Sequence, residues 1–236
     1  MSPAQAWTFA LLSHRLDRQV RSTPGVDARV ADAMMAAGRH RFVGWHLLDA
    51  FRNGSPCLGF GQYLGQPTFV AELLTAARIA PSDRILDVGT GSGFTAAVAS
   101  RLGREVLSVE RIPELAARAR ENLARAGIAN VTVVLGDAWH SDAVTGVFDV
   151  ILINAGAPRL PETAFASLAA GGRLIVPVGD RTSEGAVVGR LLRVTLSDGA
   201  PVIEDLRHCA FVPLIGAEGW PESAEPPEPR KHARVG

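Results

Sequence analysis

The sequence predicts an α/β protein built on a doubly wound, mostly parallel sheet, with helices on both faces and a helical extension at the N-terminus. Short runs of Val, Ile and Leu without polar alternation recur after about residue 83, and such runs are typical of strands buried on both faces. Helical segments alternate with these runs, as a parallel sheet requires. A glycine-rich turn, residues 89–93, directly follows the first run, at the position where such sheets bind ligands.

The expected elements follow one another in a regular order. Residues 1–78 are expected to be mostly helical, apart from an irregular stretch at 52–67 that contains Gly and Pro. Pro113 near the start and Gly127 just past the end delimit one helix of the core. The parallel strands are expected at 84–89, 105–110, 131–137, 148–156 and 173–179, the helices between them at 95–103, 113–127 and 160–172, and two antiparallel edge strands at 186–199 and 200–214.

This pattern divides the chain into three parts. Residues 1–78 form an N-terminal region packed on the core, and residues 79–216 form the ligand-binding core. Residues 217–236 become rich in Pro and charge from Pro221 onward, so we expect a disordered tail.

The composition argues against several classes of protein. Lys plus Arg equals Asp plus Glu at 24 each, so no charge excess points to nucleic acid or an anionic membrane. No run approaches the roughly 20 apolar residues of a membrane span, and no basic leader precedes the N-terminal apolar patch. Cys57 and Cys209 form no CxxC or zinc-binding spacing, and HExxH is absent, so neither a disulfide framework nor a metal site is expected. We therefore expect a soluble, cytoplasmic protein.

The glycine turn has a distinctive spacing. Gly89, Gly91 and Gly93 follow Asp87 as G-x-G-x-G, whereas the dinucleotide fingerprint G-x-G-x-x-G would place its third glycine at Phe94. Glycines at such a turn let the backbone approach a ligand closely. The pattern resembles motif I of class I methyltransferases, which have a Rossmann-like fold and bind S-adenosyl-L-methionine (SAM).

Two further acids end successive strands. Glu110 ends the second strand about 20 residues after the glycine turn, where a carboxylate can accept hydrogen bonds from both hydroxyls of a ribose. Asp137 ends the third strand and can accept from the exocyclic amine of adenine. Either acid alone could be an N-cap or a solvated strand end, but three strand-end acids with the glycine turn favour SAM.

Several segments extend the resemblance to most of the chain. In order and spacing, they are similar to the protein-L-isoaspartate O-methyltransferase family over about residues 10 to 216. The most specific are GFGQYLGQPTFVAELL and GGRLIVPVG. The other segments are RVADAMMAAGRHRFV, ILDVGTGSGF, VERIPELAARA, FDVILINAGAPRLP and FVPL.

The resemblance implies SAM as cofactor and isoaspartyl residues of damaged proteins or peptides as methyl acceptors, with protein repair as the function. We expect a monomer or weak dimer. Gln62, Tyr63 and Gly65 are expected in the segment that meets the substrate. The expected cofactor contacts are Asp87, Gly89, Thr90, Gly91, Ser92, Gly93, Glu110, Arg111, Asp137, Ala138 and Asn154.

The substrate segment departs from the family. Tyr63 stands where the family has Thr, and Gly65 stands where it has the Ser whose hydroxyl lies beside the reacting carboxylate. Gly38 and Gly44 also replace family prolines. Alternatives therefore remain open: the same fold acting on another acceptor, such as an aspartyl peptide or a small-molecule acid, or SAM binding without turnover. The glycine spacing disfavours a nicotinamide-dependent oxidoreductase.

The chemistry needs few catalytic groups. An acceptor carboxylate is already ionised at neutral pH, because model carboxyl pKa values are about 4, so no general base is expected. Rate enhancement would come from alignment and exclusion of water. Arg39, His40 and Arg41 could meet an acidic peptide, but a solvated helix end is the favoured interpretation.

Overall fold

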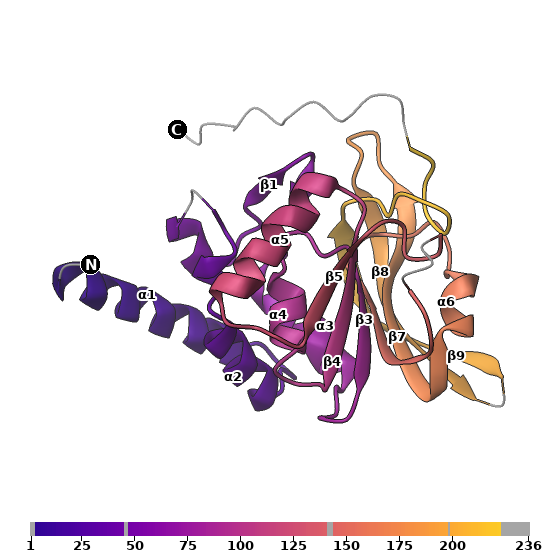
Figure 1. Ribbon diagram of the computed structural model, residues 1–236, viewed down its shortest axis with the longest axis horizontal. Coiled ribbons are helices and arrows are strands. Elements are labelled where there is room, and N and C mark those ends of the chain that lie inside the picture. The colour runs from indigo at the N-terminus through magenta and orange to yellow at the C-terminus, as the bar shows by residue number, and fades with distance from the viewer. Residues whose placement is uncertain (1–2, 45–46, 141–143, 198, 223–236) are drawn as a thin grey trace.

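A seven-stranded sheet runs through the computed structural model, which describes residues 3–44, 47–140, 144–197 and 199–222 (Figure 1). The strand order is β5-β4-β3-β6-β7-β8-β9. The first five strands in this order are parallel, and β8 and β9 are antiparallel to their neighbours, which confirms the predicted sheet. The strands are β3 (Arg84–Val88), β4 (Glu105–Glu110), β5 (Val131–Leu135), β6 (Phe148–Ile153), β7 (Leu168–Arg181), β8 (Val187–Ser197) and β9 (Ala200–Phe211).

The chain reverses its direction across the sheet between β3 and β6. From β3 it proceeds outward to β4 and β5, and β6 then pairs with the other side of β3. Ile85 and Leu86 of β3 are fully buried because both faces of this central strand are covered. The carboxyl end of β3 is therefore the position where a doubly wound sheet binds its ligand.

Helices cover both faces of the sheet, but unequally. Figure 1 shows α1 to α5 on one side and the short α6 on the other. None of the described helices combines the length and apolar character needed to cross a membrane. The helices are α1 (Pro3–Arg21), α2 (Ala28–Ala37), α3 (Pro67–Ala77), α4 (Phe94–Ala99), α5 (Pro113–Arg125) and α6 (Glu162–Ala166), with 3-10 turns η1 (Arg39–Arg41) and η2 (Leu47–Phe51).

The helix predicted at 160–172 was too long. Only Glu162–Ala166 is α-helical, and β7 already begins at Leu168, which pairs with Phe148 of β6. Gly171 has a φ of +72°, which interrupts any helix at this point. Pairing with β6 therefore outweighs the helix propensity of the Ala-rich segment.

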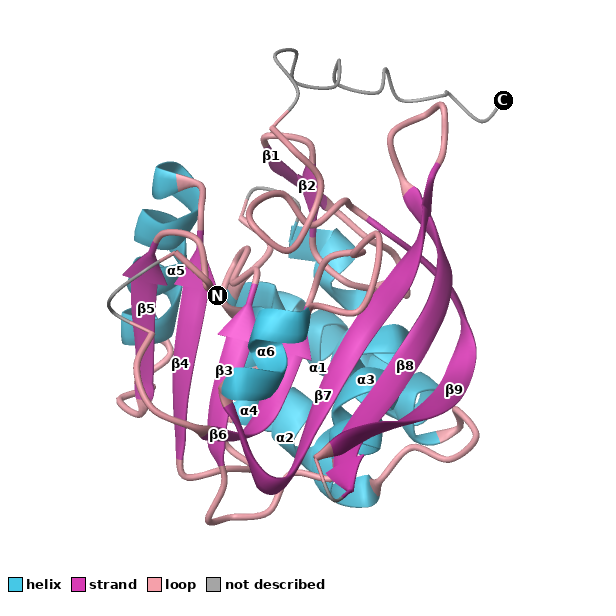
Figure 2. Ribbon diagram, turned by 90° about the vertical axis from the view of Figure 1, so that its right-hand side faces the viewer, coloured by secondary structure: helices cyan, strands magenta, loops and turns pink. Residues whose placement is uncertain are grey.

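A two-stranded antiparallel hairpin occupies the stretch predicted to be irregular. Its strands are β1 (Cys57–Gly59) and β2 (Gln62–Tyr63). The Leu64 amide donates to the Pro56 carbonyl at 2.9 Å and closes the hairpin. Figure 2 shows the hairpin beyond the carboxyl ends of the central strands. It is thus placed over the ligand-binding edge.

The ordered chain continues past residue 216. Glu218 is buried and accepts hydrogen bonds from the amide and hydroxyl of Thr163 at the start of α6. The Trp220 amide donates to the Leu214 carbonyl at 2.7 Å. The predicted disordered tail therefore begins too early, because Glu218 supplies acceptors for α6. Residues 223–236 lie outside the described residues.

Candidate active site

A cavity of about 350 Å³ opens at the carboxyl edge of the sheet. Its walls come from the glycine loop, the ends of β4, β5 and β6, the hairpin with α3, and the segment from the end of β9 to residue 215. Twelve of the predicted site residues line it. They are Gln62, Tyr63, Gly65, Gly89, Thr90, Gly91, Ser92, Glu110, Arg111, Asp137, Ala138 and Asn154.

The glycine loop forms a tight turn at the floor of the cavity. Gly89, Gly91 and Gly93 have φ values of +88°, +57° and +91°, a region that other residues rarely adopt. A Cβ at Gly91 would lie 3.3 Å from Leu58 Cδ1 of the hairpin, so the loop and the hairpin approach each other closely. Gly93 lies outside the cavity wall; it precedes α4, and a Cβ there would lie 3.3 Å from Leu123.

Asp87 lies behind the glycine loop and not in the cavity wall. Its carboxylate is fully buried and accepts from Ser108 Oγ at 2.6 Å and from Asn154 Nδ2 at 2.7 Å. The Ser108 hydroxyl also bonds with that of Thr90, a loop residue, at 2.5 Å. In this structure Asp87 supports the loop through these polar side chains, and its contact with the cofactor stays a prediction.

Burial changes the acidity of Asp87. Desolvation raises the pKa of its carboxyl to about 6, the hydrogen bonds from Ser108 and Asn154 oppose this rise, and the nearby Glu110 charge adds to it. The Asn154 side-chain amide donates to Asp87, although this side chain also borders the cavity. Asn154 therefore stabilises the glycine loop in this structure.

Glu110 faces the cavity at the end of β4. One carboxylate oxygen accepts from the Gly91 amide at 2.8 Å, and the other accepts from the Ile112 amide at 3.0 Å. A carboxylate has about four acceptor positions, so both oxygens keep capacity for hydroxyl donors of a ligand. The neighbouring Arg111 pairs with Glu222 at 3.0 Å near the rim.

Asp137 anchors the C-terminal segment. Its carboxylate accepts from the Trp139 amide and from the Ala217 amide, both at 2.9 Å. A Cβ at Gly216 would overlap this carboxylate, so the residue must be glycine for the segment to approach. Asp137 and Ala138 border the cavity as expected, and each Asp137 carboxylate oxygen accepts from one protein amide.

Two residues that border the cavity each carry a buried polar atom without a partner. Within the described residues, Ser92 Oγ and Trp139 Nε1 are buried and have no hydrogen-bond partner. Buried donors of this kind are costly unless something satisfies them. The acceptor capacity that remains on Glu110 fits the ribose hydroxyls of a nucleoside. No three His, Cys, Asp or Glu side chains gather as a metal-binding group among these same residues.

The substrate segment forms the roof on the acceptor side. Gln62, Tyr63 and Gly65 all line the cavity, and the Tyr63 side chain is 39% exposed. A Cβ at Gly65 would lie only 2.9 Å from Val70 Cγ2 in the first turn of α3. A side chain at residue 65 would therefore require Val70 to shift.

Sequence reasoning missed three contributors to the site. Ser108 was not singled out, although a polar residue within an apolar strand was a usable signal. The wall that contains Phe69 and Phe211, whose rings meet edge to face at 5.0 Å, depends on long-range packing. Arg39, expected to be solvated, is only 4% exposed and donates to backbone carbonyls of the roof.

The raised pKa of Asp87 predicts a pH-dependent stability. Between about pH 4 and pH 6 the folded state holds a proton that the unfolded state, with a pKa of 3.8, has released, so stability falls as pH rises through this window. The difference of about two pKa units corresponds to roughly 3 kcal/mol. Asp87→Asn should remove this dependence. The unfolding free energy of the variant minus that of the wild type, measured in urea, should therefore become more positive from about pH 4 to pH 7. A difference between the two proteins that is the same at both pH values would contradict the assignment.

Comparison with known sequences identifies the relatives of this chain. The sequence profile of the family described as protein-L-isoaspartate(D-aspartate) O-methyltransferase matches residues 14–219. A protein-L-isoaspartate O-methyltransferase 2 of Marinobacter nauticus is 42% identical over 196 residues, which are 83% of this chain and 88% of that protein. A protein-L-isoaspartate O-methyltransferase of Koribacter versatilis is 40% identical over 219 residues, which are 90% of this chain and 94% of that protein.

Solved structures agree with these sequences. A protein-L-isoaspartate O-methyltransferase superposes with a TM-score of 0.77 at 27% identity and covers 88% of this chain and 67% of that one. A Plasmodium falciparum chain described as such an enzyme, in complex with S-adenosyl-L-homocysteine, has a TM-score of 0.71 at 22% identity, covers 86% of this chain and 95% of that one, and supports the fold alone. The profile match and the relatives span most of the chain, which therefore belongs to the protein-L-isoaspartate(D-aspartate) O-methyltransferase family of SAM-dependent methyltransferases.

Proposed function

We propose that this chain transfers the methyl group of SAM to the free carboxylate of L-isoaspartyl residues in damaged proteins or peptides. One observation carries the proposal: a single cavity joins the glycine loop and Glu110 on one side to the segment with Tyr63 and Gly65 on the other. A cofactor and an acceptor held on these two sides would meet inside the cavity. The names of the relatives support the isoaspartyl acceptor.

The residues of the site suit a displacement that needs no general base. SAM supplies an electrophilic methyl group on a sulfonium. The acceptor carboxylate is ionised at neutral pH, so the protein has to orient it and exclude water. Leu58, Phe69 and Val70 give the roof and the adjoining wall an apolar surface that can do so.

The missing serine leaves Tyr63 as the hydroxyl donor nearest in sequence. Gly65 offers only its backbone, whereas the Tyr63 side chain is half exposed and lines the cavity two residues away. A hydrogen bond to a charged group contributes roughly 1.5–3 kcal/mol, so the tyrosine hydroxyl or water could replace part of what serine provides.

The change at Gly65 also favours a second candidate function. Gly65 and Tyr63 stand where the family has Ser and Thr, so the acceptor side presents different polar groups from a site that contains both. A different carboxylate, such as an aspartyl side chain in a peptide or a small-molecule acid, would suit an altered pocket. SAM binding without turnover is the corresponding non-catalytic alternative.

We further propose that the protein acts in the cytoplasm as a monomer or weak dimer. Cys57 and Cys209 are both free thiols, which fits a reducing compartment.

Methyl transfer from labelled SAM tests the acceptor directly. We expect base-labile label on an isoaspartyl peptide and none on the same peptide with normal aspartate or without an acid. Label on the aspartyl peptide alone would favour the second candidate. No label on any peptide, with SAM binding established by calorimetry, would contradict the proposed repair activity.

Restoring serine should help only when space is made for it. Gly65→Ser alone should lower peptide methylation, because its Cβ would press on Val70, a β-branched residue that is stiff within a helix. Val70→Ala should relieve this contact, so the double variant should exceed Val70→Ala alone by several-fold in kcat/KM, as expected for a hydrogen bond to a charged group. Equal or higher activity of Gly65→Ser without the second change would show that Val70 does not limit the site.

A further inference from the structure

The hairpin of β1 and β2, called the roof hairpin below, has two ends that lie close together. It leaves the body of the protein after Gly54 and returns at Gly65, and the Leu64 amide bonds to the Pro56 carbonyl just inside these ends. The residues between them include Gln62 and Tyr63, which border the acceptor side of the cavity. Whatever fixes the two ends therefore sets the position of these side chains over the cavity.

One guanidinium nitrogen joins both ends. Arg39 Nη2 donates to the Gly54 carbonyl at 2.8 Å and to the Gly65 carbonyl at 3.1 Å. The other terminal nitrogen, Nη1, donates to the carbonyls of Asp49 at 2.8 Å and Ala50 at 3.2 Å in η2. A planar guanidinium holds such contacts at fixed angles, which makes the base of the hairpin rigid.

The setting of Arg39 suits a positional role better than an electrostatic one. Its strong contacts are backbone carbonyls, and burial lowers the pKa of the guanidinium to about 10, with the charge of Asp49 opposing this shift. The group stays positive at neutral pH although it is only 4% exposed. Burying a charge is costly, and here the guanidinium donates to five backbone carbonyl groups of the roof and its support.

We propose that Arg39 is a positioning residue for methyl transfer: by clamping Gly54 and Gly65 it holds the acceptor segment over the cavity. The inference rests on the proposed function. Arg39 itself is absent from the cavity wall, and its recorded hydrogen bonds go to residues 49–54 and 65. The glycine loop and Glu110 are fixed by other contacts, so the clamp should act on the acceptor side more than on the cofactor side.

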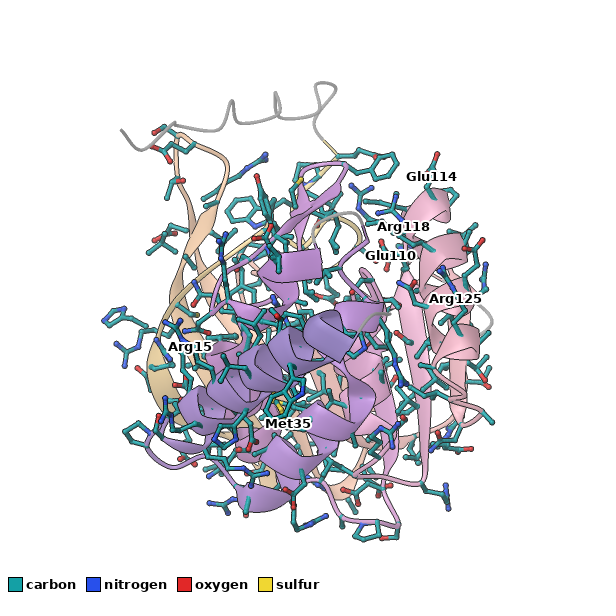
Figure 3. The ribbon with its side chains drawn as sticks, turned by 90° about the vertical axis from the view of Figure 1, so that its left-hand side faces the viewer. Arg15, Met35, Glu110, Glu114, Arg118 and Arg125 are labelled. Atoms are coloured by element: carbon teal, nitrogen blue, oxygen red, sulfur yellow. The ribbon has the colours of Figure 1, made fainter. Side chains whose placement is uncertain are left out.

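A second arginine holds the same hairpin at a different place. Arg118 of α5 donates to the Leu58 carbonyl at 2.7 Å, on the strand that passes above Gly91. Figure 3 shows Arg118 on the same half of α5 as Glu114, toward the end of the sheet that carries Glu110. The arm of the hairpin next to the cofactor side thus keeps an anchor when the base is released.

The test replaces the planar guanidinium of Arg39 by a group of the same charge. In Arg39→Lys, a single ammonium cannot reproduce the planar bridge between Gly54 and Gly65. We expect kcat for isoaspartyl-peptide methylation to fall roughly 10-fold to 100-fold, as for a small misplacement of reacting groups, and affinity for S-adenosylhomocysteine to change by less than about threefold. Arg41→Met, an exposed arginine in the same 3-10 turn, is the matched control and should retain wild-type values.

Hydrogen–deuterium exchange provides a readout that does not depend on activity. Exchange should rise in the peptide that covers residues 55–65 of Arg39→Lys and stay at wild-type levels in β3 and β4. Wild-type exchange in residues 55–65 with wild-type kcat would overturn the proposal. So would a general rise across the sheet together with loss of S-adenosylhomocysteine affinity, which would indicate a merely structural role. If the wild type itself methylates no isoaspartyl peptide, the proposed function fails, whereas exchange and cofactor affinity still decide whether Arg39 holds the roof.

Discussion

The buried carboxylate of Asp87 is the interaction on which the site depends. It lies on β3 and receives hydrogen bonds from Ser108 on β4 and from Asn154 just after β6, so it ties together three neighbouring strand ends. Ser108 extends the connection to Thr90 in the glycine loop. Since desolvation disfavours this charge, the two donors are needed to keep it buried, and the loop above takes its shape from them.

The two sides of the cavity are built by different means. The cofactor side is formed by strand ends and a glycine loop, which the sheet fixes directly. The acceptor side is formed by a small hairpin that has only two short strands and is held by arginine contacts to its carbonyls. An acceptor segment of this kind can change between relatives without disturbing the sheet. This separation accounts for an intact glycine loop in a chain whose substrate segment carries Tyr63 and Gly65.

The sequence was sufficient for the sheet because its signals are local. The apolar runs at β3, β4 and β6 and the glycine spacing after Val88 predicted the parallel core and the position of the cavity. Signals that depend on distant partners were misread. The Ala-rich segment before Arg173 looked helical but pairs with β6, and Arg39 looked like a solvated helix end because its carbonyl partners lie 10 to 26 residues away. The position of Asp87 behind the loop likewise depends on distant partners, Ser108 and Asn154.

The central claim is that a nucleoside cofactor binds over the glycine loop with its ribose at Glu110. The most direct measurement is calorimetric titration of S-adenosylhomocysteine into Glu110→Ala, with Glu114→Ala in the first turn of α5 as the control. Because Glu110 lies in the cavity wall and also orders the Gly91 amide, affinity should fall by at least about tenfold, whereas Glu114→Ala should bind as the wild type does. Equal affinity of Glu110→Ala and the wild type would contradict this placement of the cofactor.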